Sequence, residues 1–321
     1  MFKSKTFIAI FLFLMIVSMA SVFGAGRVET EKDAFKIAVV PKALDNAVFL
    51  DTKDAAEAKG KELGVNIEWV GPQKSDASEQ VNVLEGLIQK GVDAILVSCN
   101  DANVLEDVIN RAVDSGIIVA TFDSDSPNSK RSFYIGTNNY TLGVTSGEKM
   151  MELLPSGGNV AILTGVPGMP NLETRIQGFR DTIKGSRLEI VAVQTGNCDT
   201  QQSVDAIAQY TTANPTLDAW WVVGVWPFFA DPASIPELRK FANQGGVTIS
   251  IDAVYPQLAY VQEGTIDVLI GQDFGKMGSD GVEALYKMLT GDTSIPDYID
   301  TGYVLVDSSN IKEVVERTVP W

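Results

Sequence analysis

Short apolar runs alternate along the chain with longer stretches that have helical periodicity. Runs at residues 35–41 (FKIAVVP), 93–98 (DAILVS) and 117–122 (IIVATF) are separated by helical stretches at residues 48–63, 75–90 and 102–115. The apolar runs are continuous instead of alternating with polar residues, which is typical of strands buried on both faces of a parallel sheet. The pattern therefore predicts an α/β fold built from strand–helix units.

The alternation restarts at residues 159–164 (NVAILT) and continues to a last strand at residues 303–306. Between the two series, residues 134–147 (YIGTNNYTLGVTSG) are polar and glycine-dotted, and we interpret them as a segment that crosses between domains without a helix. The number of strand–helix units favours two doubly wound parallel-sheet domains over one small sheet. The segment lengths also leave a single (β/α)₈ barrel open.

The first residues have the pattern of a secretory signal. Lys3 and Lys5 precede an apolar run at residues 7–17, which is short for a membrane span, and small residues follow. We predict a signal peptide over residues 1–24 and a mature protein in the periplasm or another extracytoplasmic space; an uncleaved signal anchor is the alternative. Export permits disulfides, but we expect Cys99 and Cys198 to lie in different domains as free thiols.

Composition excludes several classes of function. The chain has no histidine, so triads that need one and histidine-ligated metal sites are impossible. A net charge of −16 argues against nucleic acid as a partner. Glycine-rich phosphate loops, a nucleophile elbow and closely spaced metal ligands are also missing, so we expect no cofactor, no metal and no catalytic residue.

Polar side chains follow many of the predicted strands, and open α/β sheets bind ligands at the carboxyl ends of their strands. Carboxylates and amides suit a polyhydroxylated ligand because they accept and donate hydrogen bonds to hydroxyl groups. Arg175 is the one cation that the pattern places well, and its planar fork fixes geometry. The strand-end candidates are Asn46, Asn100, Asp101, Asp123, Asp125, Asp252, Gln272 and Asp273.

Each of these residues also has an ordinary structural interpretation. An aspartate at a strand end is more often a turn former or a helix cap than a ligand-binding group. Trp220 and Trp221 are expected to pack in a core, whereas Trp226 lies beyond its strand and is a candidate for stacking against a ligand.

Two segments carry a resemblance to a known family. The run GVPGMPNLETRIQGF, residues 165–179, is similar to the G-x-P-G-x-P-[DN]-x-E-x-R segment of glucose/galactose-binding proteins. The run FDSDSPNSKRSFYIGTNNY, residues 122–140, resembles thermophile members that bind glucose or xylose. Over residues 35–305 the chain resembles the periplasmic sugar-binding proteins of ABC importers, of the ribose and glucose/galactose kind.

The resemblance implies two α/β domains joined by a three-segment hinge, with a ligand cleft between them that closes over the sugar. It puts the crossings near Thr137–Asn138, Gln272–Asp273 and Asp300–Thr301. The N-terminal lobe is then residues 28–137 with 273–299, and the C-terminal lobe is residues 138–272 with 300–321. The ligand-binding residues that it implies, together with the stacking candidate, are Asn46, Phe49, Asp123, Asn171, Arg175, Trp226, Asp252 and Gln272.

The chain also departs from the family pattern. Cys198 stands where the second lobe usually has an aromatic residue, and Val48 replaces an aromatic in the first. Met169 replaces a polar residue, and Trp226 or Phe228 is expected to restore the missing aromatic face. These changes suggest a ligand that is not simply galactose or ribose, and a cyclitol or a different aldose fits equally well. The ligand class therefore stays open among glucose, xylose, galactose, ribose and myo-inositol.

The resemblance implies a monomeric, non-enzymatic solute receptor that captures a monosaccharide or cyclitol and delivers it to the membrane subunits of an ABC permease. One alternative is a sugar sensor for a chemoreceptor or kinase ectodomain, which would use the same cleft. A remote alternative is a glycoside-active enzyme with Asp123 and Asp252 as its carboxylate pair.

Overall fold

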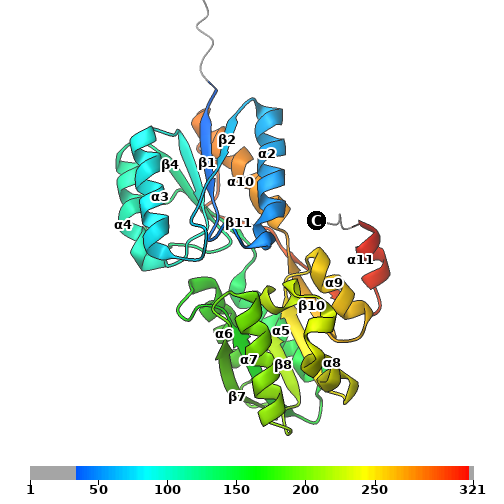
Figure 1. Ribbon diagram of the computed structural model, residues 1–321. Coiled ribbons are helices and arrows are strands. Elements are labelled where there is room, and N and C mark those ends of the chain that lie inside the picture. Colours follow the sequence, from blue (N-terminus) through cyan, green and yellow to red (C-terminus); the bar gives the residue numbers. More distant parts are fainter. Residues whose placement is uncertain (1–33, 318–321) are drawn as a thin grey trace, which may run out of the picture. The chain divides into compact units, whose positions relative to one another are not determined.

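The computed structural model describes residues 34–317, which form two parallel-stranded sheets with helices on both faces (Figure 1). The signal peptide predicted for residues 1–24 lies outside the described residues. Each sheet is six-stranded and open, which excludes the barrel. Sheet A has the order β11-β5-β4-β3-β1-β2, with β1 Lys36–Val40, β2 Asn66–Trp69, β3 Ala94–Val97, β4 Ile118–Phe122, β5 Tyr134–Gly136 and β11 Tyr298–Asp300.

Sheet B repeats this arrangement with the second half of the chain. Its order is β12-β10-β9-β8-β6-β7, with β6 Gly158–Thr164, β7 Leu188–Thr195, β8 Ala219–Val222, β9 Val247–Ile251, β10 Val268–Gln272 and β12 Tyr303–Asp307. All pairs in both sheets are parallel except β10 with β12, which is antiparallel. Two doubly wound sheets are the fold class that the apolar runs predicted.

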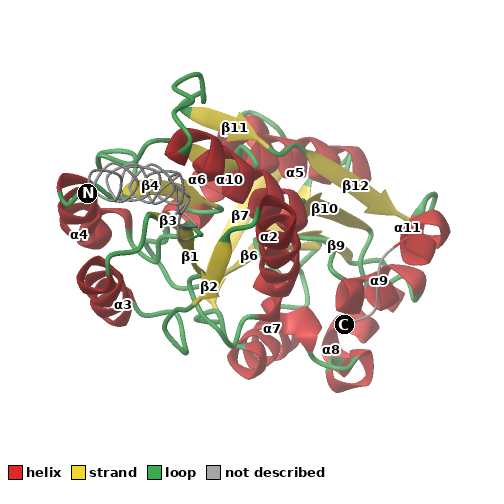
Figure 2. Ribbon diagram, turned by 90° about the horizontal axis from the view of Figure 1, so that it is seen from above, coloured by secondary structure: helices red, strands yellow, loops and turns green. Residues whose placement is uncertain are grey.

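The helices lie on both faces of the sheets (Figure 2). They are α2 Leu50–Leu63, α3 Ala77–Lys90, α4 Ala102–Asp114, α5 Asn139–Leu153, α6 Pro170–Ile183, α7 Thr200–Ala213, α8 Pro236–Asn243, α9 Tyr255–Gln262, α10 Phe274–Leu289 and α11 Ile311–Arg317. Short 3₁₀ turns occur at Ala47–Phe49, Trp226–Phe229 and Pro232–Ser234.

Adjacent strand residues explain why the apolar runs are continuous. In β1, Ile37 packs with residues of α2 and α10 on one face, whereas Ala38 packs with residues of α3 and α4 on the other. In β8, Trp221 joins the core under α5 and α6, and Trp220 joins the core under α7, α8 and α9. Both tryptophans are completely buried, so the prediction that they pack in a core is confirmed.

The segment between the two halves is more regular than its sequence predicted. Residues 134–136 form β5, and residues 139–153 form helix α5, where we expected no helix. We took the glycines of this segment as a sign of irregular structure, but in α5 they allow close packing against α6. A Cβ atom on Gly143 would lie 2.0 Å from the carbonyl oxygen of Arg175, so α6 approaches α5 this closely only because that position has no side chain.

The chain passes between the two sheets three times, from β5 to β6, from β10 to β11 and from β11 to β12. Two of these connections are tied together by side chains. The Thr137 hydroxyl lies 3.2 Å from that of Thr301 and donates to the Gly302 carbonyl at 2.9 Å. The carboxyl ends of strands from both sheets meet beside these connections, and this is where the polar strand-end residues gather.

Candidate functional site

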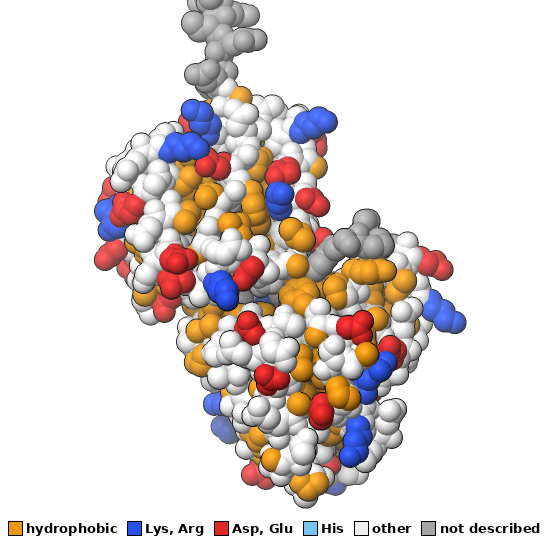
Figure 3. All heavy atoms as spheres, in the orientation of Figure 1, with side chains coloured by type: hydrophobic (Ala, Val, Ile, Leu, Met, Phe, Trp, Pro, Cys, Tyr) orange, Lys and Arg blue, Asp and Glu red, His pale blue; other side chains and the backbone are white. Residues whose placement is uncertain are grey.

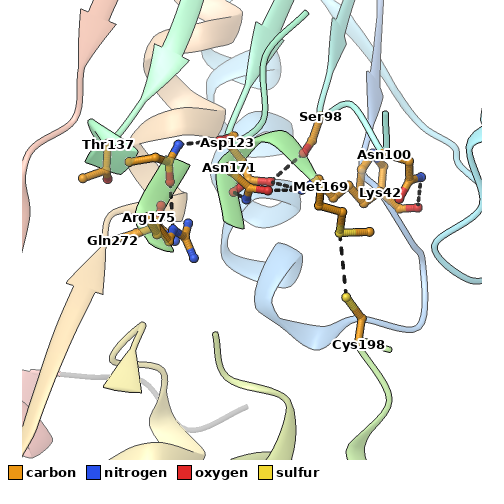
Figure 4. A network of polar contacts seen from close by, with 12 residues as sticks. Lys42, Ser98, Asn100, Asp123, Thr137, Met169, Asn171, Arg175, Cys198 and Gln272 are labelled. Carbon is orange, nitrogen blue, oxygen red and sulfur yellow. Dashed lines mark hydrogen bonds and ion pairs between the residues drawn. The ribbon is translucent and has the colours of Figure 1, made fainter. Parts of the chain in front are cut away.

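A cavity lies between the strand ends of the two sheets, where about 410 Å³ is free of protein atoms, including space that is open to solvent. Its lining includes all the ligand-binding residues that the family resemblance implied, together with the stacking candidate, but not the strand-end candidates Asn100, Asp101, Asp125 and Asp273. The lining residues among those expected are Asn46, Phe49, Asp123, Asn171, Arg175, Trp226, Asp252 and Gln272. Residues far apart in the chain are therefore brought together by the two sheets, as Figure 4 shows for part of the group.

Asp123 follows β4 in the left-handed backbone region, with φ of 56°, and is 4% exposed. Its Oδ2 atom accepts a hydrogen bond from the Ser98 hydroxyl at 2.6 Å, and its Oδ1 atom accepts one from Asn171 Nδ2 at 3.3 Å (Figure 4). Positive φ is uncommon for a residue with a side chain and persists only where the surroundings enforce it. The backbone here turns the carboxylate into the cavity, a geometry that a helix cap does not need.

Lys42 is a lining residue that the sequence analysis missed, so Arg175 is not the one cation of the site. Its Nζ atom donates to Asn171 Oδ1 at 2.8 Å and lies 3.6 Å from Asp123 Oδ2. Burial lowers the pKa of Lys42, and the Asp123 carboxylate opposes that shift. A lysine just after a strand ordinarily reaches solvent; its place in the same connection as Asn46 is the signal that would have identified it.

Buried amides hold the backbone around Lys42. Gln80 donates to the carbonyls of Pro41 at 3.2 Å and Ser98 at 2.7 Å, and its Oε1 atom accepts from the Asn100 amide at 2.9 Å. Asn100 in turn donates to the Lys42 carbonyl at 2.8 Å. Two neighbouring strand ends are thereby fixed against each other, so the strand-end residue Asn100 supports the site from behind.

Arg175 lies on α6 and is 2% exposed. Its Nε atom donates to Asn139 Oδ1 at 2.8 Å and its Nη1 atom to the Val223 carbonyl at 2.8 Å. Its Nη2 atom is buried and has no hydrogen-bond partner. Buried polar groups in proteins are nearly always paired, so this unpaired guanidinium nitrogen on a cavity-lining residue is a candidate donor to a ligand.

Asp252 and Gln272 form the acceptor side of the cavity. Asp252 follows β9 with φ of 74°, and Gln272 Nε2 at the end of β10 donates to its Oδ1 atom at 2.8 Å. The Gln272 Oε1 atom is buried without a partner. Burial raises the pKa of Asp252 to about 6, although Arg175 and the Gln272 hydrogen bond act in the opposite direction. At neutral pH the folded protein therefore contains a buried, ionised carboxylate that lowers its stability.

The apolar lining has aromatic and sulfur parts. Phe49 packs edge-on against Phe122 and Phe274 at ring-centre distances of 5.9 and 5.7 Å. Trp226 lines the cavity and is 6% exposed, whereas Phe228 is completely buried against Tyr260, so of the two it is Trp226 that faces the site.

The two sulfur-containing residues that depart from the family pattern lie together. Cys198 Sγ and Met169 Sδ are 3.9 Å apart at the cavity wall (Figure 4). Cys198 and the wholly buried Cys99 are both free thiols.

The other strand-end aspartates have the ordinary structural roles. Asp101 accepts hydrogen bonds from Asn103 and Val104 as the cap of α4, and Asp273 accepts one from the Lys276 amide as the cap of α10. Asp125 is engaged by the Arg131 side chain, whose Nε and Nη2 atoms each donate to it at 2.7 Å. Backbone conformation separates the two groups, because the cavity residues Asp123 and Asp252 have positive φ and the helix caps do not.

The described residues, 34–317, show neither a metal-binding cluster nor a membrane-spanning helix. Among these residues, no group of three or more histidine, cysteine, aspartate or glutamate side chains is placed to hold a metal ion. Over the same range, no helix has the length and apolar content that a membrane crossing requires. On the face in Figure 3, acidic and basic side chains are interspersed, without a basic patch.

Comparison with known proteins gives a consistent set of similarities. Residues 37–293 match the sequence family described as a periplasmic binding protein domain. The xylose/arabinose-binding protein of Sulfolobus acidocaldarius is 26% identical over 297 residues, which cover 88% of this chain and 73% of that protein. The D-ribose/D-allose-binding protein of Pseudomonas aeruginosa is 27% identical over 282 residues, 84% of this chain and 86% of that one.

A solved structure resembles the chain over most of its length. It is an ABC transporter solute-binding protein from Burkholderia graminis in complex with D-arabinose. The two share 33% identity with a TM-score of 0.82, over 89% of this chain and 98% of the other.

Proposed function

The chain belongs to the periplasmic binding protein family, and from this premise we propose that it is the sugar-binding component of an ABC importer. It captures a monosaccharide or cyclitol in the cavity between the two sheets and delivers it to the membrane permease outside the cytoplasm. The observation that carries the proposal is the pair of buried, unpartnered polar atoms on the cavity lining, Arg175 Nη2 and Gln272 Oε1. A hydroxylated ligand supplies the acceptor and the donor that these two atoms lack.

The lining residues suggest a division of roles. Asp123 and Asp252 accept hydrogen bonds from sugar hydroxyls, and Arg175 donates to ring or hydroxyl oxygens. Asn46, Asn171 and Gln272 both donate and accept. Phe49 and Trp226 contact the apolar faces of the ring. A sugar that lacks one hydroxyl leaves a buried group unpaired, at about 1–3 kcal/mol, and this penalty is how such a site discriminates between near-identical sugars.

Lys42 adds a donor that the family resemblance did not supply. Its Nζ atom has three protons, and the protein partners within reach are Asn171 and Asp123. Its position on the cavity lining supports a direct contact with a sugar oxygen. The names of the similar proteins include both pentoses and hexoses, so sugars of both classes should be tested with this chain.

We also propose the lobe boundaries implied by the family, residues 28–137 with 273–299 and residues 138–272 with 300–321, and a monomeric receptor. The sheet membership of the strands and the three passages between the sheets support these boundaries. Closure of the lobes over the sugar follows from the position of the cavity, which takes its lining from both sheets.

Thermal unfolding in the presence of single sugars tests the proposal. The chain from residue 25 is unfolded and refolded to remove co-purified ligand, then mixed with D-arabinose, D-xylose, D-ribose, D-glucose, D-galactose or myo-inositol. A ligand at about 1,000 times its dissociation constant adds about 4 kcal/mol of stability and raises the midpoint by several degrees.

The test variant is Arg175→Met, which removes a proposed sugar contact. Its control is Asp107→Asn, a change at an exposed residue outside the cavity. We expect the first to abolish the shift and the second to keep it. The recovered sugar is expected to be chemically unchanged, whereas turnover would support the enzyme alternative. Absence of a shift with every member of the panel would refute monosaccharide capture.

A further inference from the structure

Asn139 joins residues from both sides of the cavity, although the sequence patterns do not single it out. It is the first residue of α5, which lies within the first passage from sheet A to sheet B, between β5 and β6. Its Oδ1 atom accepts the hydrogen bond from Arg175 Nε at 2.8 Å. Its Nδ2 atom lies 3.4 Å from the Asp123 carbonyl and 3.3 Å from the Tyr134 hydroxyl, to both of which it donates.

On the Arg175 side, this contact fixes the direction of the guanidinium group. Asn139 and the Val223 carbonyl engage Nε and Nη1, on opposite sides of the planar fork. The plane of the group is then determined, and the unpartnered Nη2 atom is held in one orientation. Without the Asn139 acceptor, the fork is free to rotate about its remaining contact.

On the Asp123 side, the same amide supports a strained backbone. The Asp123 carbonyl accepts from Asn139 Nδ2 and from the Tyr134 hydroxyl, the latter at 3.0 Å. Tyr134 is itself fixed by stacking on Tyr298, with ring centres 5.5 Å apart. The positive φ of Asp123 directs its carboxylate into the cavity, so donors to its carbonyl stabilise the conformation that the site requires.

We propose that Asn139 is a positioning residue of the sugar site, which holds the Arg175 guanidinium of α6 and the turn at Asp123 after β4 in one relative geometry. This inference rests on the proposed function, because it assigns a role within the same site. Asn139 acts through Arg175 and Asp123 and does not belong to the cavity lining.

Asn139→Ala tests the inference, and the adjacent Asn138→Ala is its matched control. Asn138 is exposed and caps α5 by accepting from the Thr141 amide at 3.0 Å, so its loss weakens the helix without touching Arg175. The probe is the panel sugar that stabilises the unaltered protein most. We expect Asn139→Ala to weaken its affinity about 10- to 100-fold. Asn138→Ala lowers the unfolding temperature and leaves the affinity within about twofold.

Two further variants separate positioning from a general structural effect. Asn139→Asp keeps the acceptor for Arg175 Nε but loses the amide donor to the Asp123 carbonyl, so it is expected to recover only the part of the affinity that depends on Arg175. In an Arg175→Lys background, where a cation remains but the Nε donor is gone, Asn139→Ala is expected to reduce the sugar affinity much less than in the unaltered protein. An unchanged affinity in Asn139→Ala, or an equal loss in both backgrounds, overturns the inference.

A measurement without sugar keeps this inference distinct from the proposed function. Hydrogen exchange of the Arg175 Nε–H group, assigned by comparison with Arg175→Lys, is expected to be slow in the unaltered protein and in Asn138→Ala. It is expected to be fast in Asn139→Ala, since the bond that protects the proton is removed. Equal exchange rates overturn the positioning role, whereas slow exchange without any sugar binding refutes the proposed function alone.

Discussion

Replacing Asp252 by asparagine is expected to stabilise the protein at neutral pH and to remove most of its sugar affinity. Burial raises the pKa of Asp252 from 3.8 to about 6. Each unit corresponds to about 1.4 kcal/mol, so ionised Asp252 lowers the free energy of unfolding by about 3 kcal/mol. Asparagine has the shape of the neutral acid, accepts the Gln272 hydrogen bond through its oxygen, and tolerates the φ of 74°.

The sign of the effect depends on pH in a defined way. Well below pH 3.8 the carboxyl is protonated in both the folded and the unfolded protein, so Asp252 costs no stability. Between about pH 3.8 and 6 the folded protein keeps a proton that the unfolded chain has lost, so the free energy of unfolding decreases as pH rises, and it levels off above about pH 6. The advantage of Asp252→Asn is therefore small near pH 4 and reaches its full value above pH 7.

Denaturant unfolding at a series of pH values from 4.5 to 8, without sugar, measures this advantage. Asp107→Asn makes the same change of net charge on the exposed face of α4 and is expected to show little pH-dependent gain. The reasoning is refuted if Asp252→Asn is no more stable than the unaltered protein at pH 8, or if its gain is the same at both ends of the series.

The same substitution tests the function of the buried charge. A charged acceptor contributes about 1.5–3 kcal/mol to a hydrogen bond, so its loss weakens sugar binding about 10- to 100-fold. Titration calorimetry with the panel sugar that stabilises the unaltered protein most measures this change in affinity. A variant that is more stable and binds more weakly indicates that the carboxylate is retained for recognition at the expense of stability.

Two other predictions concern the cavity wall and the helix pair behind it. A thiol reagent is expected to modify Cys198 slowly in the native protein, because burial raises the pKa of its thiol, and bound sugar is expected to block the reaction. Mass spectrometry should find Cys99 modified only after unfolding. A Cys198 modification rate that sugar does not change would place Cys198 out of contact with the bound ligand. Gly143→Ala is expected to lower the free energy of unfolding by about 1–3 kcal/mol and to weaken sugar binding, because the new Cβ atom collides with the carbonyl of Arg175. Calorimetric unfolding measures the stability and a titration measures the affinity. Unchanged stability would contradict the close packing of α5 on α6.

Much of the fold was predictable because a strand that is buried on both faces is visible in the sequence as a continuous apolar run. Strand β3 is apolar and buried at every position, β1 is apolar and buried after its first residue, and helices such as α4 show an apolar face next to them. The elements that were missed lack such a pattern. Strand β11 has alternating exposed and half-buried residues at a sheet edge, and α5 contains glycines whose value lies in contact with α6. Their stability depends on neighbours that are distant in the chain.

The candidate site was predictable to the extent that its residues follow strands. Asp123, Asp252 and Gln272 stand at strand ends, where parallel sheets collect their ligands, and the family resemblance added Asn171 on α6. Sequence did not distinguish these residues from the helix cap Asp101, because both kinds of aspartate follow an apolar run. The difference is a backbone angle, which the surrounding structure imposes.

By itself, the sequence determined the two parallel sheets, the absence of histidine chemistry and the supply of hydrogen-bonding groups at the strand ends, because each depends on the identity and spacing of neighbouring residues. The tertiary structure alone decided that Lys42 lies in the cavity, that Arg175 keeps one unpaired nitrogen, and that Asn139 links it to the turn at Asp123. These features depend on burial and on contacts between residues from different sheets. Local sequence does not encode such contacts, since their energy arises only when the strand ends are brought together.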